Sequence, residues 1–164
     1  MSRGAGAGPL SRRRALLGLL AAPLALQGCG GPAQADRPPD IAFGEDRCAR
    51  CGMIISEERY ATGFVPDGGG DVLTFDDPGE MMETLSEQHF PAGRVWVHDA
   101  GGAWIDGTTA FYVAGPPAKT PMGTGLVAFG DRAAAEAHAA GQWNVLSWAE
   151  AKDWRPPGTP TAMP

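Results

Sequence analysis

The stretch DVLTFDDP, residues 71–78, predicts how the chain folds. Residues 71–75 have the β-branched and aromatic composition of a strand. Asp77 and Pro78 then favour a helix start, because a carboxylate caps free backbone N–H groups and proline suits the first helical position. We expect this helix to end near Glu87. Its apolar side should fill the core with Met81, Met82 and Leu85.

The same order of elements recurs later in the chain. Phe75 and Phe129 are 54 residues apart, and so are Asp77 and Asp131. Such a fixed spacing is typical of an internal repeat. Further strands are expected over 59–65, 110–113 and 125–129, and a second helix over 131–140 that Gly141 ends. The predicted class is α+β, with two repeated β-β-α units of antiparallel strands over 41–92 and 93–154.

Two further elements are expected outside the repeat. Residues 94–99 and 103–106 have strand composition and flank Gly101 and Gly102, so we expect a hairpin there. Residues 143–154 are expected to form a last short helical piece.

The N-terminus has the pattern of a targeting segment rather than of folded structure. Arginines at 12–14 precede an apolar run over 15–26, which is short for a membrane span and suits a signal-peptide core. The Leu26–Cys29 stretch is typical of a bacterial lipobox, so we predict a signal peptide over 1–28 and a lipid on Cys29. The arginines are also typical of a twin-arginine signal, and a Sec signal stays open.

Lipidation places the mature protein outside the cytoplasm, anchored to a membrane and facing the periplasm. Residues 29–40 are expected to form a flexible tether rich in proline and glycine, and 155–164 a flexible tail. Four of the 13 Lys and Arg residues lie in 1–28, so nine remain against 19 acidic residues, a mature net charge of −10. An acidic surface of this kind argues against nucleic-acid binding.

The main chemical feature is CARCGM, residues 48–53. Thiolate and thioether sulfur are soft ligands that favour Cu(I). Cys51 and Met53 can converge if the backbone turns at Gly52. Met122, in a turn-rich segment between Pro121 and Gly123, is a candidate to complete the site from the second unit.

Two other interpretations of the Cys48 and Cys51 pair stay open. Outside the cytoplasm the pair could form a disulfide or act in thiol redox chemistry, although the strand and helix context of a thioredoxin motif is missing. Zinc would need two more ligands, such as two of His89, His98 and His138, but the spacing matches no familiar finger. His98 is also a candidate third copper ligand.

No motif of an enzyme is present. The sequence holds no paired-carboxylate motif, no Ser/His/Asp order with its local context, and no phosphate-binding loop. An open metal site without a catalytic base predicts a protein that carries metal and is not an enzyme.

With these segments in view, the chain resembles the NosL family, the accessory lipoproteins of nitrous oxide reductase. The resemblance covers most of the mature chain. Its motifs are the lipobox at Cys29, DRCARCGM over 46–53, FDD over 75–77, WID over 104–106, FYV over 111–113, TPMG over 120–123 and AF at 128–129. The Cys-Gly-Met and Thr-Pro-Met-Gly segments together make it specific.

The resemblance implies a lipid-anchored Cu(I) metallochaperone that faces the periplasm. It would deliver copper to the copper centres of nitrous oxide reductase during denitrification, together with a membrane transporter and a periplasmic helper. It also implies a fold of two β-β-α units. The family pattern implies the ligand role most strongly for Cys51 and Met122, then for Met53, and least for Cys48.

Overall fold

The computed structural model describes residues 37–87, 92–115 and 119–155, all within one unit of the chain that spans residues 31–164. Predictions that concern the signal peptide, Cys29, His89 and the tail beyond Arg155 lie outside the described residues. Within the described ranges, no helix has the length and apolar character that crossing a membrane requires.

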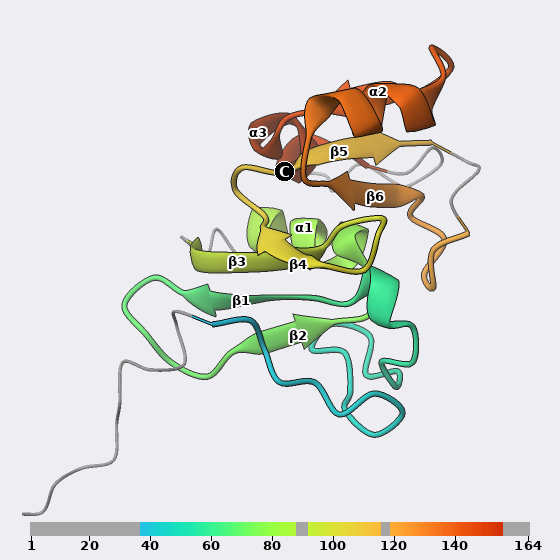
Figure 1. Ribbon diagram of the computed structural model, residues 1–164. Coiled ribbons are helices and arrows are strands. Elements are labelled where there is room, and N and C mark those ends of the chain that lie inside the picture. The colour runs from blue at the N-terminus through green and yellow to red at the C-terminus, as the bar shows by residue number, and fades with distance from the viewer. Residues whose placement is uncertain (1–36, 88–91, 116–118, 156–164) are drawn as a thin grey trace, which may run out of the picture. The chain divides into compact units, whose positions relative to one another are not determined.

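The first sheet has four strands in the order β2-β1-β3-β4, all antiparallel (Figure 1). A short 3-10 helix, η2 (Glu58–Tyr60), leads into β1 (Thr62–Pro66), which pairs with β2 (Leu73–Phe75) as a hairpin. Helix α1 (Pro78–Glu87) follows β2 at once, at the residues expected from the sequence. Strand β3 (Ala92–His98) returns beside β1, and β4 (Trp104–Asp106) adds the edge.

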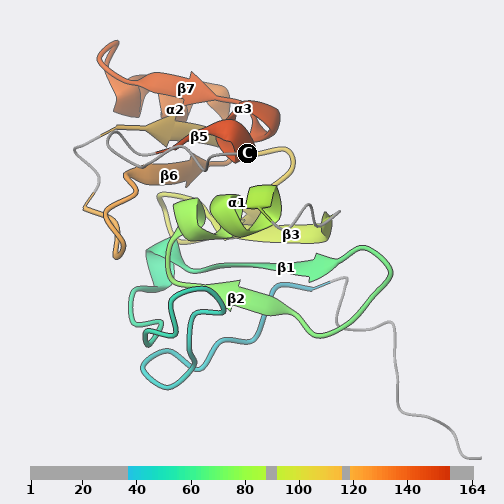
Figure 2. The same ribbon diagram turned by 180° about the vertical axis from the view of Figure 1, so that it is seen from behind.

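The second sheet has three antiparallel strands in the order β6-β5-β7. Strand β5 (Phe111–Ala114) pairs with β6 (Leu126–Phe129), helix α2 (Arg132–Ala139) follows, and β7 (Asn144–Leu146) returns beside β5. Helix α3 (Trp148–Asp153) comes last (Figure 2). Ser147 and Glu150 form its capping box. The predicted α+β class with repeated antiparallel units is confirmed.

The structure extends the repeat by one strand. The order β1-β2-α1-β3 forms a sheet with β1 in the centre, and β5-β6-α2-β7 does the same with β5 in the centre. Each repeated unit is therefore β-β-α-β. Because β3 and β4 hydrogen-bond to the first sheet, the two sheets divide between Asp106 and Phe111, later than the predicted unit boundary at residues 92 and 93.

Alternating side chains bury both faces of the second sheet, as the pleat of a strand requires. Tyr112 and Leu126 join the main core with Phe64, Phe75 and α1, whereas Val113 and Val127 pack with Ala135 and Ala139 of α2 in a second cluster. The predicted core residues Met81, Met82 and Leu85 are buried. Helix α1 contacts β1 and β2 of the first sheet and β6 and α3 of the second half.

Candidate metal centre

Arg47 and Ile54 form an isolated β-bridge. The chain between them makes a tight turn that carries both cysteines. The Gly52 N–H donates to the Cys48 carbonyl at 3.0 Å, and the Cys48 N–H donates to the Met53 carbonyl at 2.8 Å. Gly52 has φ of +74°, a left-handed conformation that glycine adopts without strain. The glycine thus lets the chain reverse between Cys51 and Met53, as the sequence predicts.

This cysteine turn is fastened to the first repeat on two sides. The Ala49 N–H donates to the Thr74 carbonyl of β2 at 2.8 Å. The Arg50 guanidinium contacts Glu83 at 2.9 Å and Glu87 at 2.8 Å, both on α1. Because Arg50 stands between the cysteines, these contacts hold the cysteine turn against α1.

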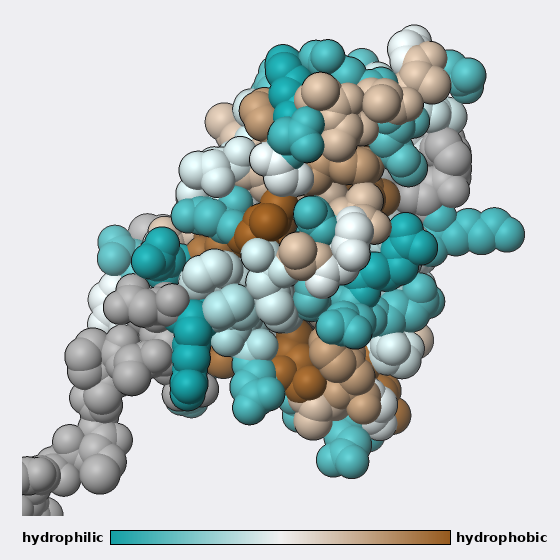
Figure 3. Space-filling model, viewed as in Figure 1, coloured by the Kyte–Doolittle hydropathy of each residue, from teal (hydrophilic) through white to brown (hydrophobic). Residues whose placement is uncertain are grey.

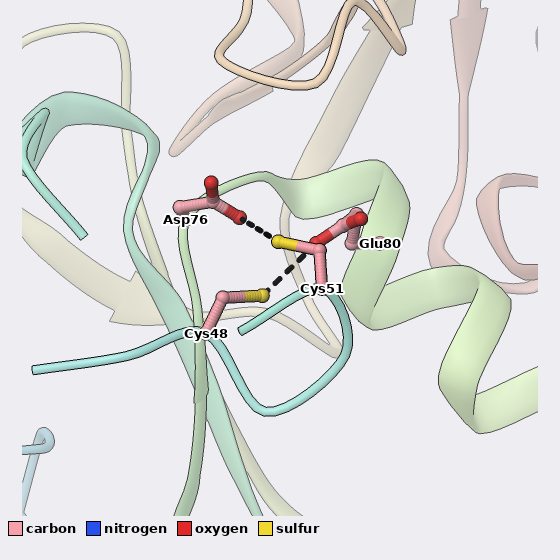
Figure 4. A group of neighbouring side chains, drawn as sticks. All are labelled: Cys48, Cys51, Asp76 and Glu80. Carbon is pink, nitrogen blue, oxygen red and sulfur yellow. Dashed lines mark hydrogen bonds between the residues drawn. The ribbon is translucent and has the colours of Figure 1, made fainter. Parts of the chain in front are cut away.

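The start of α1 presents two carboxylates to the thiols, which Figure 4 shows converging on one small space. Asp76 immediately precedes the helix cap Asp77, and Glu80 lies on the first turn of α1. The Cys48 Sγ donates to Glu80 Oε2 at 2.9 Å, and the Cys51 Sγ lies 3.9 Å from Asp76 Oδ1. One ligand atom from each residue lies within 4.8 Å of the others.

Burial differs sharply across this group. Cys48, Asp76 and Glu80 are 3%, 2% and 6% exposed, whereas Cys51 is exposed. Cys51 is therefore the member of the cluster that an incoming ion or partner reaches first.

The pKa shifts of the cluster favour protonated groups. Burial raises the pKa of the Cys48 thiol, and the hydrogen bond to Glu80 raises it further. Partial burial likewise raises the pKa of the Cys51 thiol. Burial raises the pKa of the Glu80 carboxyl, although hydrogen bonds from the two thiols oppose that rise. Metals bind the thiolate, so a bound cation would reverse these preferences.

Asp77 connects the start of α1 to the loop that holds Met122. Its Oδ2 accepts the Met122 N–H at 3.0 Å, and its Oδ1 accepts the Gly79 N–H at 2.8 Å and the Thr124 hydroxyl. Asp77 is fully buried. The predicted cap residue Asp77 therefore also holds the Thr-Pro-Met-Gly loop against the start of α1.

The two predicted methionine ligands face solvent. Met53 is 54% exposed and Met122 is 37% exposed. Only two other large apolar side chains of the described residues are comparably exposed: Ile54, which closes the cysteine turn, and Phe43, a few residues before it. In Figure 3, hydrophobic surface lies among hydrophilic surface in the lower part of the view, where Figure 1 places the chain before β1.

The two described histidines lie elsewhere. The buried ring of His98 stacks on Trp104 and its Nδ1 hydrogen-bonds the Ala61 carbonyl at 3.0 Å, while His138 on α2 packs against Phe129. Burial lowers the pKa of His98. Among the described residues, neither joins the group that contains the cysteines.

Comparison with known proteins identifies the family. A family model described as NosL matches residues 42–152. The chain belongs to the NosL family. The resemblance seen in the sequence is thereby confirmed.

Two NosL proteins can be compared in detail. The copper-binding lipoprotein NosL of Stutzerimonas stutzeri is 33% identical over 125 residues, which cover 68% of this chain and 65% of that protein. The chain thus spans less than two thirds of that relative. The crystal structure of the copper chaperone NosL from Shewanella denitrificans matches with a TM-score of 0.62 at 20% identity, over 70% of this chain and 94% of that chain. At this identity the match concerns the fold.

Sequence reasoning missed two members of the cluster in this NosL-family chain. Asp76 appeared only within the FDD motif beside the cap Asp77, and Glu80 was not singled out. The available signal was the presence of two acidic residues on either side of the predicted cap Asp77, one just before the helix and one in its first turn. Their proximity to the cysteines depends on the fold of the turn against β2, which the spacing alone does not reveal.

Proposed function

We propose that this chain is a membrane-anchored metallochaperone that binds Cu(I) and delivers it for assembly of the copper centres of nitrous oxide reductase. Its partners would be the reductase, a copper-assembly transporter and a periplasmic helper. The lipid on Cys29 would hold it to a membrane, facing the periplasm. Membership of the NosL family supports the copper-binding role, as do its copper-binding relative from Stutzerimonas stutzeri and the copper chaperone from Shewanella denitrificans.

The observation that carries the proposal is the setting of Cys51. The Cys51 thiol is exposed and borders the buried side chains of Cys48, Asp76 and Glu80. Met53 follows two residues later in the chain. The Met122 backbone is hydrogen-bonded to Asp77, the neighbour of the Asp76 that approaches Cys51. Soft thiolate and thioether sulfurs at an exposed site suit an ion that must be bound and then released.

The proposed ligands are Cys51 and Met122, then Met53, with Cys48 as the least certain member. A partner that receives copper would approach Cys51 and cover the exposed apolar side chains of the cysteine turn. No reaction is proposed at this site, so the chain would act as a carrier rather than as an enzyme.

The alternative is a thiol-redox lipoprotein that uses Cys48 and Cys51. A redox-active thiol is ordinarily favoured by a lowered pKa and an electropositive setting. Here burial raises the pKa of both thiols and two carboxylates lie beside them, which favours metal binding over disulfide exchange.

Anaerobic titration with Cu(I) against a competing chelator tests the proposal. We expect one tightly bound ion, lost in Cys51→Ser and weakened in Met122→Ala. Unchanged affinity in both variants would reject the ligand assignment. Survival of biological activity in Met53→Ala and Met122→Ala, together with disulfide transfer by the wild type, would instead support the redox alternative.

Membrane attachment is tested separately by fractionation. We expect the chain in the membrane fraction and Cys29→Ser in the soluble periplasmic fraction. Equal distribution of the two proteins would reject the anchor.

A further inference from the structure

The ring of His98, at the end of β3, is buried in a place that does not suit a titratable group. The residue is 2% exposed, and its ring lies against Trp104 of β4 with the ring centroids 3.7 Å apart. Histidine is the side chain whose charge ordinarily changes between about pH 5 and pH 8. The group that contains the cysteines does not include this ring, so its burial requires another explanation.

The hydrogen bonds of His98 determine which ring nitrogen carries the proton. Nδ1 lies 3.0 Å from the Ala61 carbonyl, and because a carbonyl only accepts, the Nδ1–H must donate. In the neutral ring Nε2 is therefore an acceptor. It is buried and has no hydrogen-bond partner among the described residues. Protonation would place a second N–H at Nε2, where the described part of the chain offers no acceptor.

The charged groups around the ring do not compensate for its burial. Glu58 of η2 and Asp99 are the carboxylates whose charge acts on His98, and both favour the protonated form. Glu58 is exposed, and Asp99 Oδ1 already accepts two backbone N–H groups of its own hairpin. Strands β1 and β4 present only neutral groups, the Ala61 carbonyl and the Trp104 ring. Burial is the largest effect and lowers the pKa of His98.

His98 connects the two segments of the first half that contact the second half near β6. Its acceptor Ala61 directly follows Tyr60, which packs in the second core cluster with side chains of β6. On the other segment, His98 lies two residues before Ala100, whose N–H donates to the Ala128 carbonyl of β6 at 2.9 Å. The contacts of Tyr60 and Ala100 with the second half form a joint, and the His98 ring holds the two segments of this joint together.

We propose that His98 is an acid-sensitive latch at this joint. The neutral ring holds residues 60–61 against residues 98–100, and the joint is closed. A protonated ring is accommodated only when the joint opens and water reaches Nε2.

The direction of the pH dependence follows from the two states of the ring. In the open joint His98 is solvated and has the ordinary histidine pKa of about 6.5, whereas burial lowers its pKa in the closed joint. The open state therefore binds more protons. The closed joint is most stable above the ordinary pKa and loses stability as the pH falls below it.

The latch makes the copper site sensitive to pH, a consequence that rests on the proposed function. Cys51 belongs to the first half and Met122 to the second, so a looser joint lets these two ligands move apart. Asp77 provides a separate link between the halves through its bond to Met122, so the opening is local. We expect acid to weaken Cu(I) binding more than protonation of the thiols alone would.

Hydrogen exchange of the copper-free full chain, measured by NMR at pH 7.5 and pH 5.5, tests the latch. After correction for intrinsic exchange rates, we expect the protection of the Ala100 amide to fall about fivefold or more in acid. Gly107, whose N–H donates to the Val95 carbonyl within the first half, is the reference and should change less than about twofold. No fall at Ala100, or an equal fall at both amides, would overturn the proposal.

Two variants remove the titration in different ways. His98→Phe keeps a ring against Trp104, and His98→Asn keeps a donor for the Ala61 carbonyl. We expect the protection of Ala100 to be the same at both pH values in each variant. His138→Asn, which changes an exposed histidine of α2, is the matched control and should keep the wild-type response. An acid response that persists in both His98 variants would overturn the latch.

The wild type alone also decides the matter if the His98 variants fail to fold, which circular dichroism reveals. NMR titration should show the His98 ring binding its proton at a lower pH in the folded chain than in the chain unfolded by urea. Equal titration in the two states would overturn the proposal.

Copper measurements separate the latch from the proposed function. Between pH 7.5 and pH 5.5 we expect the wild type to lose at least about threefold more Cu(I) affinity than His98→Phe. A wild type that shows the latch in hydrogen exchange but binds no Cu(I) would reject the copper function and leave the latch standing. Tight Cu(I) binding without an acid response at Ala100 would reject the latch alone.

Discussion

The two halves of this molecule repeat one topology but differ at the start of their helices. In the first half, Asp76 and Glu80 flank the cap Asp77. At the corresponding positions, 54 residues on, the second half has Gly130 and Ala134 around the cap Asp131. Asp131 makes an ordinary cap, accepting the Ala134 N–H at 2.8 Å. The two helix starts share an aspartate cap, but only the first adds two carboxylates and an adjoining cysteine turn, which together form the candidate metal centre.

The caps themselves differ in what they hold. Asp131 is exposed and serves only its own helix. Asp77 is buried and also accepts hydrogen bonds from Met122 and Thr124, in the other half of the molecule. Gly79 beside it admits no side chain, because a Cβ there would lie 2.4 Å from the Thr124 Cβ. The first cap thus joins the halves beside the candidate metal centre.

The caps should differ in their contribution to stability. Asp77→Ala leaves the buried Thr124 hydroxyl and the backbone N–H groups of Gly79 and Met122 without their acceptor, so we expect the free energy of unfolding to fall by about 2–3 kcal/mol. Asp131→Ala loses only an exposed cap, worth about 1 kcal/mol. Urea denaturation followed by circular dichroism measures both. Equal losses would mean that Asp77 does not join the two halves.

Copper binding should depend on the cap residue Asp77 and not on the cap residue Asp131. In Asp77→Asn the Met122 loop loses a charged acceptor, and we expect Cu(I) affinity to fall about tenfold, the scale seen when groups that orient a ligand are removed. Asp131→Asn is the matched control and should bind Cu(I) as the wild type does. A similar loss in the control would indicate a general effect of folding.

The smallest effect should come from the ion pair between Arg50 and Glu87, which attaches the cysteine turn to α1. The Arg50 guanidinium lowers the pKa of the Glu87 carboxyl, so this pair stabilises the fold above the normal pKa of Glu, and its contribution is lost as the pH falls through the lowered value. For so exposed a pair we expect Glu87→Gln to cost less than about 1 kcal/mol at pH 7. Denaturation at pH 7 and pH 3 should show the difference between the variant and the wild type shrinking in acid.

Local sequence signals predicted most of the fold. The composition of 71–78 and its recurrence 54 residues later gave the helices α1 and α2 and the hairpins β1-β2 and β5-β6. The third strands of the repeats were not recognised as such. Strand β3 was assigned to a separate hairpin and β7 to a helical piece, because their partners β1 and β5 are far away in sequence and pairing at that separation leaves no local pattern.

The candidate site was predictable only in part. Cys48, Cys51 and Met122 carry a chemical signature by their residue type, and Gly52 marks the turn between ligands. Acidic residues such as Asp76 and Glu80 are ordinary at a helix start. Only their tertiary contact with the cysteine turn makes them candidate metal ligands. The zinc site considered from sequence used histidines, but His98 is committed to the core against Trp104 and Ala61.

X-ray absorption at the copper edge tests the central claim most directly, namely that the first half binds Cu(I) through Cys51 with Met122 supplied by the second. The Cu(I)-loaded chain is compared with Met122→Leu, each prepared without oxygen. We predict an inner shell of sulfur alone in the wild type and one sulfur fewer in the variant. An inner shell with nitrogen or oxygen ligands, or an identical spectrum in Met122→Leu, would contradict the account.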